Sequence, residues 1–250
     1  MWRPAATGNA PVMSEAPRVS VVIPVRNEAL NIGPLVAEIE AALAGVPHEI
    51  VCVDDGSTDE TAAALAEAAK TAPVRILRHR ASCGQSAAVI TGVKAARGEW
   101  IATLDGDGQN DPADIPALLA AAGHEGPRVL IAGHRVNRKD SAVRRVTSRH
   151  ANRIRAWLLR DATPDSGCGL KVFPRALFLE LPHFDHMHRF LPALTMRAGA
   201  RVVSVPVNHR PRLRGTSNYG TLDRLAVSVS DLLGVAWLLR RGKRPDLIEP

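Results

Sequence analysis

The N-terminal half of the chain alternates between short apolar runs and longer stretches whose apolar residues recur at helical spacing. The stretches place apolar residues three and four positions apart, as between Ile32 and Leu43, and they predict amphipathic helices. Strands separated by helices of this length favour a mostly parallel sheet covered on both faces. The short runs are rich in Val, Ile and Leu and predict strands at Val19–Ile23, Glu49–Val53, Val74–Leu77, Trp100–Leu104 and Val129–Ala132.

Turn and cap signals mark where several helices begin. Ser57–Glu60 has the pattern of a capping box, in which its first two side chains cap a helix that runs to about Lys70. A further helix is predicted over Gln85–Ala96. Asp111–Pro112 predicts another helix start, because Pro is favoured at the first helical position.

The second half of the chain is less regular. It predicts a basic helix over Ala142–Leu159, short strands at Leu170–Phe173 and Val202–Val207, and an amphipathic helix over Thr221–Leu239. The expected organisation is a flexible leader at residues 1–18, one α/β domain at residues 19–220, and a C-terminal amphipathic helix with a basic tail at residues 221–250.

Composition narrows the class of protein. Of the 250 residues, 46% are hydrophobic, which is enough for a sizeable core, and the net charge of +7 indicates an anionic partner. The cysteines Cys52, Cys83 and Cys168 have no CxxC spacing, which argues against a disulfide framework or a zinc site and favours a reducing cytosol. Because the sequence nowhere has about 20 consecutive apolar residues, we expect any membrane contact to be peripheral.

Acidic turns follow two of the predicted strands. Asp54 and Asp55 come after the second strand, and Asp105 and Asp107 come after the fourth. In open α/β sheets, ligands bind at the carboxyl ends of the strands, where both turns should lie. Two carboxylates one residue apart can share a hard cation such as Mg²⁺ or Mn²⁺, and the other turn can accept hydrogen bonds from a base or ribose.

The chain resembles the family 2 glycosyltransferases of the GT-A fold. Within that family it is similar to the dolichol-phosphate mannosyltransferase and undecaprenyl-phosphate glycosyltransferase branch. Each motif is short, and the resemblance depends on their number and order between Val19 and Leu239. The matching segments are Val21–Glu28, Val53–Asp59, Leu104–Gln109, Asp165–Lys171, Met187–Leu194 and Arg212–Tyr219.

This resemblance implies a Rossmann-like α/β fold, a GDP- or UDP-linked sugar donor, and Mg²⁺ or Mn²⁺ as cofactor. It implies that His188 and Arg189 lie near the acceptor. One departure is Asn218, which stands where many relatives have lysine, and it leaves open how that loop holds a phosphate. The residues implied to bind the nucleotide-sugar are Pro24, Arg26, Glu28, Val53, Asp55, Asp105, Gly106 and Gln109. The implied metal ligands are Asp105, Asp107 and Gln109, and the implied catalytic residues are Asp107, Arg135 and Arg212.

The acceptor implied by the resemblance is a polyprenyl phosphate at the cytoplasmic membrane face, whose phosphate attacks the anomeric carbon of the donor with inversion. A phosphate monoester has a second pKa of about 6, so this nucleophile needs cations around it more than a base. The basic stretch Arg135–Arg160 supplies cations, and Arg210, Arg212 and Arg214 alternate in a way that suits a phosphate-binding lid.

The C-terminal helix has two interpretations. With Trp237 and the basic cluster Arg240–Arg244, Thr221–Leu239 has the character of an interfacial helix that holds the protein at the inner face of the cell membrane. Packing of the same helix on the core is the alternative.

Other functions remain as rivals. A family 2 enzyme with a soluble or saccharide acceptor would use Asp107 or a nearby acid as a base. A nucleic-acid-binding protein is disfavoured, because no RNP, KH or zinc-finger pattern occurs and only 4% of residues are aromatic. A dinucleotide-binding oxidoreductase is disfavoured because no GxGxxG follows the first strand.

Overall fold

A computed structural model of the protein describes residues 16–136, 155–211 and 221–241. Its first half alternates strands and helices, as the apolar pattern predicts. The elements are β1 (Val19–Val25), α1 (Ala29–Ala42), β2 (His48–Asp54), α2 (Thr61–Ala68), β3 (Val74–Arg78), α3 (Gln85–Ala95), β4 (Trp100–Thr103), the 3-10 turn η1 (Pro112–Asp114), α4 (Ile115–Glu125) and β5 (Val129–Arg135).

The second half adds shorter elements. Residues 155–159 are helical, and the rest of the predicted helix Ala142–Leu159 lies outside the described residues. The remaining elements are β6 (Lys171–Pro174), α6 (Arg175–Leu179), the 3-10 turn η2 (Met187–Arg189), α7 (Leu191–Arg197), β7 (Arg201–Val207) and α8 (Thr221–Arg240).

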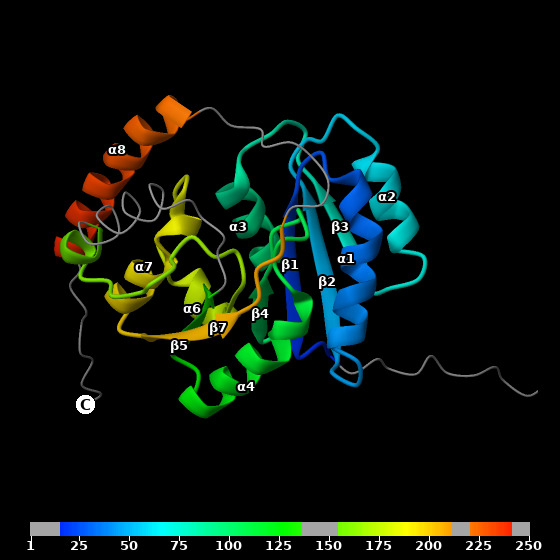
Figure 1. The fold of residues 1–250 in the computed structure, drawn as a ribbon, viewed down its shortest axis with the longest axis horizontal. Helices are drawn as coiled ribbons and strands as arrows, with labels where there is room; N and C mark the ends of the chain where they lie inside the picture. Colours follow the sequence, from blue (N-terminus) through cyan, green and yellow to red (C-terminus); the bar gives the residue numbers. More distant parts are fainter. Residues whose placement is uncertain (1–15, 137–154, 212–220, 242–250) are drawn as a thin grey trace, which may run out of the picture.

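Within the described residues, the strands form one sheet of seven strands in the order β3-β2-β1-β4-β6-β5-β7 (Figure 1). β1 pairs in parallel with β2 and β4, and β5 pairs in parallel with β7. β6 runs antiparallel to both of its neighbours, with Lys171 opposite Thr103 of β4. The start of β6 therefore lies at the edge where the parallel strands end.

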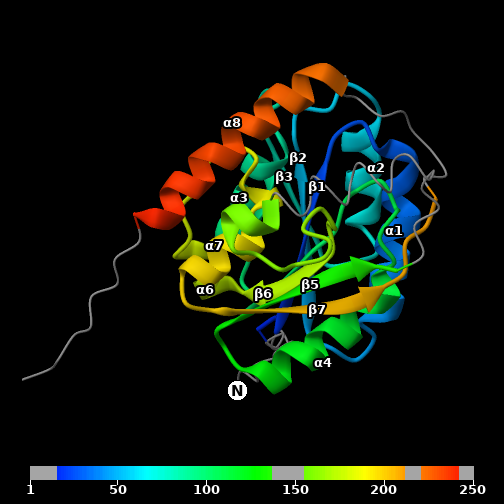
Figure 2. The ribbon, with the colours of Figure 1, turned by 60° about the vertical axis from the view of Figure 1, so that its left-hand side comes forward.

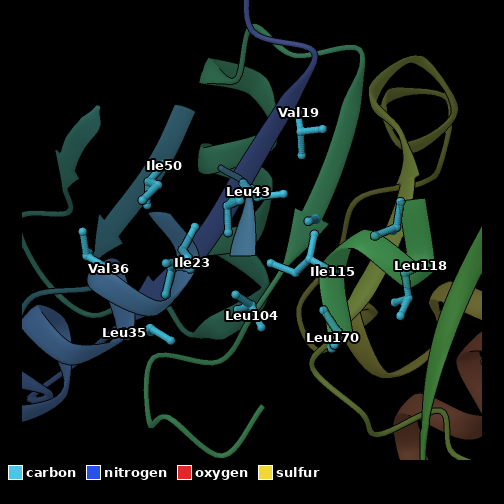
Figure 3. Packing of buried hydrophobic residues seen from close by; sticks show 14 of the residues in the cluster. Val19, Ile23, Leu35, Val36, Leu43, Ile50, Leu104, Ile115, Leu118 and Leu170 are labelled. Atoms are coloured by element: carbon cyan, nitrogen blue, oxygen red, sulfur yellow. The ribbon is translucent and has the colours of Figure 1, made fainter. Parts of the chain in front are cut away.

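Helices cover both faces of the sheet because successive strand residues point to opposite sides. On β1, Ile23 belongs to the cluster that packs on α1, α2 and α4, whereas Val22 packs toward α3, α6, α7 and α8. Figures 1 and 2 show these two helical layers on either side of the strands. Figure 3 shows the first cluster, in which Ile23 and Ile50 lie near Val36 of α1. Burying each such side chain stabilises the fold by about 1.5–3 kcal/mol.

The predicted capping box is wrong. Helix α2 begins at Thr61, and the Oδ1 atom of Asp59 accepts a hydrogen bond from its backbone N–H at 3.0 Å. The hydroxyl of Ser57 instead accepts from the backbone N–H of Asn27, also at 3.0 Å. The Ser57 side chain thus bonds to a loop that is distant in the sequence, and the local sequence pattern gives no sign of this contact.

The predicted start at Asp111 is confirmed, although the first turn is of the 3-10 type. Asp111 Oδ1 accepts a hydrogen bond from the backbone N–H of Ala113 at 3.0 Å, and α4 follows from Ile115.

Candidate active site

The functional side chains gather at the carboxyl edge of the parallel strands. The loops after β1, β2, β4 and β5 all leave the sheet there. Because β6 is antiparallel, the segment that precedes it, Asp165–Leu170, reaches the same edge. Sequence motifs that lie far apart along the chain are thereby brought together.

The acidic turn after β4 is held by its own backbone and by one neighbouring side chain. Asp105 is half-buried, and its Oδ1 atom accepts a hydrogen bond from Gln85 Nε2 at 2.8 Å. Asp107 Oδ1 accepts from the backbone N–H of Gln109 at 3.1 Å. Gly106 is needed within the turn, because a Cβ atom there would lie 2.8 Å from Val25 Cγ1.

Asp105 also packs against the backbone of Gly169. A Cβ atom at Gly169 would lie 2.2 Å from Asp105 Oδ2, which is closer than two non-bonded atoms can approach without one of them moving. The glycine of the segment before β6 therefore leaves the space that the carboxylate of the turn after β4 occupies. This contact joins two of the sequence motifs directly.

The acidic turn is suited to a divalent cation. Burial raises the pKa of Asp105, and the neighbouring charge of Asp107 raises it further, while Lys171 and Arg135 lower it. Two carboxylates one residue apart, which offer oxygen donors only, match the ligand preference of Mg²⁺ and Mn²⁺. The residues present therefore fit the cofactor that the resemblance implies.

Buried cations lie beside this turn. Arg135, at the end of β5, donates from Nε to Asp165 Oδ2 at 2.6 Å and from an Nη atom to Asp165 Oδ1 at 2.8 Å. This forked bond to Asp165 raises the pKa of Arg135. Lys171 is only 4% exposed, and its Nζ atom donates to the carbonyl oxygen of Cys168. Burial lowers the pKa of Lys171, although the nearby acidic groups oppose that shift.

His188 and Arg189 approach the site from η2. His188 Nδ1 lies 2.8 Å from the hydroxyl of Ser86, and that hydroxyl also accepts from the backbone N–H of His188 at 3.2 Å. Burial, together with the charges of Lys171 and Arg189, lowers the pKa of His188 to about 3. The ring is therefore neutral at physiological pH, and its position is set by the first turn of α3.

A cavity of about 500 Å³ opens between these groups. It brings together five of the predicted residues: Pro24, Asp105, Arg135, His188 and Arg189. It also includes Arg155, from the basic stretch predicted to supply cations around the acceptor, and four residues to which the sequence assigned no role in the site, namely Gln85, Asp165, Lys171 and Leu232. Asp165 and Lys171 stood inside a matching segment, so their motif was a signal; Gln85 and Leu232 carried none.

The remaining predicted residues lie around the loops after β1 and β2. Arg26 is exposed, and Glu28 Oε2 accepts a hydrogen bond from Asn31 Nδ2 at 2.5 Å. Val53 belongs to β2, and its side chain is fully buried against α3, so only its backbone can reach a ligand. Arg212 lies outside the described residues.

Asp55 is the most strongly engaged residue on this side. Its carboxylate accepts hydrogen bonds from Ser82 Oγ at 2.7 Å and from the backbone N–H groups of Cys83 and Gly84 at 2.8 and 2.9 Å, and it lies 2.7 Å from His79 Nδ1. Burial alone would raise the pKa of Asp55, but these hydrogen bonds outweigh it and the net pKa is lowered. Asp55 is therefore ionised and fixes the loop that leads into α3.

Arg210 is paired within the protein. Its guanidinium lies 2.7 Å from Glu38 Oε2 and 2.7 Å from Asp111 Oδ1. The backbone N–H of Arg210 donates to the carbonyl of Gln109 at 3.0 Å, which ties this strand end to the acidic turn. Arg212 and Arg214, the other two members of the predicted lid, lie outside the described residues.

One side of α8 closes the cavity. Leu232 lines it, Asp231 Oδ2 lies 2.8 Å from His186 Nδ1, and Val235 and Ala236 are buried. The interpretation that this helix packs on the core is confirmed. In the part of the chain that the structure describes, no helix has the length and apolar character needed to cross a bilayer.

The outward side of α8 remains apolar and open. Val229, Leu233 and Trp237 recur at four-residue spacing and are 52%, 60% and 61% exposed. Trp157 is 77% exposed and borders the C-terminal end of the same helix, together with Arg160 and Arg240. We call these four apolar side chains the outer apolar face.

The sheet order, the paired carboxylates and the cations beside them define an α/β protein whose cleft can hold an anionic group next to a divalent cation. Residues 20–182 match the family model described as "Glycosyl transferase family 2". The chain belongs to this family, and its enzyme class is glycosyltransferase.

Curated relatives match most of the chain. It is 36% identical over 247 residues to the dodecaprenyl-phosphate galacturonate synthase of Rhizobium johnstonii, which covers 95% of this chain and 71% of that protein. It is 37% identical over 221 residues to the undecaprenyl-phosphate 4-deoxy-4-formamido-L-arabinose transferase of an Enterobacter species, covering 86% of this chain. The chain spans 66% of the length of that second relative.

Solved structures confirm the fold. A glucosyl-3-phosphoglycerate synthase from Mycobacterium tuberculosis, crystallised with Mg²⁺ and uridine diphosphate, has a TM-score of 0.65 to this chain. The similarity covers 93% of this chain and 81% of that one at 19% sequence identity. The predicted GT-A architecture, with its mostly parallel sheet and flanking helices, is therefore correct.

Proposed function

We propose that the protein transfers a sugar from a GDP- or UDP-linked donor to a polyprenyl phosphate, with inversion at the anomeric carbon. The observation that carries this proposal is the position of α8. One side of that helix lines the cation-rich cavity through Leu232, and the other side is the outer apolar face. A phosphate placed in the cavity would thus have an apolar surface close by for its hydrocarbon chain. Relatives named for dodecaprenyl and undecaprenyl phosphate support this acceptor.

The reaction needs no side-chain base. The acceptor phosphate, with a second pKa of about 6, is already ionised at neutral pH. One of its oxygens attacks the anomeric carbon, the bond from that carbon to the donor diphosphate breaks, and the nucleoside diphosphate leaves. Arg135, Lys171 and Arg189 lie where they would hold the acceptor phosphate, since all three line the cavity.

Asp105 and Asp107, with Gln109 beside them, would hold Mg²⁺ or Mn²⁺. The bound cation would neutralise charge on the departing diphosphate. This proposal agrees with the oxygen-only donor set of the turn and with the Mg²⁺ in the crystal structure of the mycobacterial fold relative. Pro24, Arg26, Glu28, Asp55 and the backbone of Val53 would bind the nucleotide, Gly106 would allow its close approach, and Arg212 would contact a phosphate.

The protein would lie peripherally on the inner face of the cell membrane, with the outer apolar face in the interfacial region. Arg240 and Arg241 support this orientation, and the Arg241 guanidinium lies 5.6 Å from the centre of the Trp237 ring. Cations next to an exposed tryptophan favour contact with anionic headgroups. Replacing both Leu233 and Trp237 by Glu should lower binding to anionic vesicles at least tenfold, whereas Glu67→Gln, on the far layer, should not.

The test of the acceptor is transfer of radiolabelled sugar into the organic phase with added undecaprenyl phosphate. We expect label in that phase with one class of nucleotide-sugar and Mn²⁺. Label that never enters the organic phase but reaches a soluble saccharide would contradict the lipid acceptor. The family 2 enzyme with a saccharide acceptor and Asp107 as base would then replace it.

A further inference from the structure

A group of mixed metal-binding side chains lies on the nucleotide side of the site, outside the lining of the main cavity. It consists of Asp55, His79 and Cys83, which come from the turn after β2, the end of β3 and the loop before α3. One carboxylate oxygen, one imidazole nitrogen and the thiol sulfur all lie within 4.8 Å of one another.

The three donors differ in kind from those of the acidic turn after β4. A carboxylate oxygen, an imidazole nitrogen and a thiolate sulfur suit Zn²⁺ or Co²⁺, whereas Mg²⁺ and Mn²⁺ prefer oxygen alone. The Asp55 and His79 side chains are mostly buried, and Cys83 is exposed. The group therefore has two fixed ligands and one that solvent can reach.

The surroundings of the first two ligands are those of a metal site. His79 Nδ1 lies 2.7 Å from Asp55 Oδ1, and Nε2 lies 3.0 Å from Thr91 Oγ1. If a metal took Nδ1, the ring proton would reside on Nε2 and be donated to the Thr91 hydroxyl. Such an outer hydrogen bond orients the ring in most histidine metal sites. Ser82 and the Gly84 N–H hold the other carboxylate oxygen of Asp55.

We propose that Asp55, His79 and Cys83 bind one Zn²⁺ ion, with water as the fourth ligand. Bonds form from the metal to the Asp55 oxygen, His79 Nδ1 and Cys83 Sγ, and the thiol proton is released to solvent. Tetrahedral zinc with bonds of about 2.0–2.3 Å places its ligand atoms about 3.3–3.6 Å apart. Asp55 Oδ1 and His79 Nδ1, which now lie 2.7 Å apart, would therefore separate slightly, and the thiol sulfur would move to within bonding distance of the metal. Cys83 can supply its part of that movement because its side chain is at the surface and its sulfur is held within the described residues by a weak hydrogen bond to Ala81 O at 3.4 Å.

This site goes beyond the proposed transferase activity and also bears on it. Asp55 belongs to the residues proposed to bind the nucleotide, so bound Zn²⁺ would compete with the sugar donor. That consequence rests on the proposed function, whereas metal binding itself does not. The protein would then carry two cation sites of opposite preference, one that supports turnover and one that blocks it.

The experiment is a Co²⁺ titration of the full chain in excess Mg²⁺, which occupies the oxygen-donor turn. We expect one equivalent of Co²⁺ to produce a thiolate-to-cobalt absorption in the near ultraviolet, and Zn²⁺ to remove it. Cys83→Ser should abolish this absorption. Thr91→Val should weaken Co²⁺ binding about tenfold while leaving the absorption in place. Absence of the absorption in the wild type, or its persistence in Cys83→Ser, would overturn the site.

The buried cysteines make the spectroscopic assignment specific. Cys52 and Cys168 are buried, and burial raises the pKa of both thiols, that of Cys52 to about 12, so the thiolate form that a metal needs is disfavoured at both. Circular dichroism of Cys83→Ser verifies folding, which an exposed substitution should preserve.

Inhibition is then measured separately. Zn²⁺ should raise the apparent KM for the nucleotide-sugar in the wild type but not in Cys83→Ser, whose activity without zinc should be normal. Binding without inhibition would overturn the competition with the donor and leave the metal site standing. Loss of the proposed transfer reaction would leave the cobalt spectrum to decide the metal site on its own.

Discussion

At the carboxyl edge of the sheet, the charged side chains on the two sides are stabilised in different ways. On the side proposed to bind the nucleotide, Asp55 is surrounded by donors from one loop, two of them backbone N–H groups. On the side proposed to bind the acceptor, Arg135 and Lys171 are held by Asp165 and by a backbone carbonyl from the segment before β6. On the first side an anion is stabilised mainly by neutral hydrogen-bond donors. On the second side one cation, Arg135, is paired with a carboxylate, and the other, Lys171, donates to a backbone carbonyl. In the proposed reaction, Asp55 would face the nucleotide of the donor, and the two cations would face the acceptor phosphate.

The largest effect should come from the acidic turn that separates the two sides. Asp107→Asn should lower turnover about 1000-fold or more, because one of the two carboxylates proposed to hold the cation is lost. The thermal unfolding temperature should change little, since Asp107 is only half-buried. Sugar transfer in Mn²⁺ and in excess EDTA measures this, with Glu67→Gln as the exposed carboxylate control. Full activity of the variant, or of the wild type in EDTA, would refute the metal assignment.

The next largest effect should come from Arg135, where two variants distinguish loss of the positive charge from loss of stability. Arg135→Gln leaves Asp165 buried without its cation and should reduce both kcat/KM, by about 100-fold, and the free energy of unfolding, by about 3 kcal/mol. Adding Asp165→Asn should restore most of the stability, because no uncompensated charge remains, without restoring activity. Urea unfolding and steady-state kinetics on the single and double variants measure this. If the double variant regained activity, Arg135 would be a structural residue only.

The contact between Gly169 and Asp105 can be tested by adding a single methyl group at Gly169. Gly169→Ala would bring a Cβ into Asp105, so we expect kcat/KM to fall at least tenfold and stability to fall by about 1–3 kcal/mol. Gly123→Ala is the matched control, because that glycine lies in α4 with nothing within 4 Å of an added Cβ. The control should be neutral or more stable, by up to about 1 kcal/mol. Equal behaviour of the two variants would show that the Gly169 contact does not matter.

The smallest effect concerns the neutral ring of His188. Its pKa falls from 6.5 to about 3 on folding, so between these values the unfolded chain binds a proton that the folded chain does not. Stability must therefore drop as pH falls through this window, and His188→Gln should remove that part, which amounts to at most about 1.4 kcal/mol per pH unit. Urea unfolding at pH 7 and pH 5 compares the variant with wild type and with the exposed control His124→Gln. An unchanged pH dependence in His188→Gln would contradict the neutral ring.

Local patterns determined much of this protein. The period of apolar residues predicted the strands and helices of the first half to within a few residues, because buried strands must be apolar on both faces. It also placed Asp55 and Asp105 at one edge, since parallel strands end together. The capping-box prediction is wrong because the Ser57 hydroxyl accepts a hydrogen bond from the backbone N–H of Asn27, which lies in another loop.

Only the tertiary structure decided the rest. The direction of β6 follows from its pairing with β4 and β5, and that direction brings Asp165 and Lys171 to the site. The cysteine spacing argued against zinc, yet folding places Cys83 next to Asp55 and His79, which are 28 and 4 residues away in the sequence. Periodicity records which residues are buried, but it carries no information about which distant side chains share a cavity, because those contacts depend on strand order and packing.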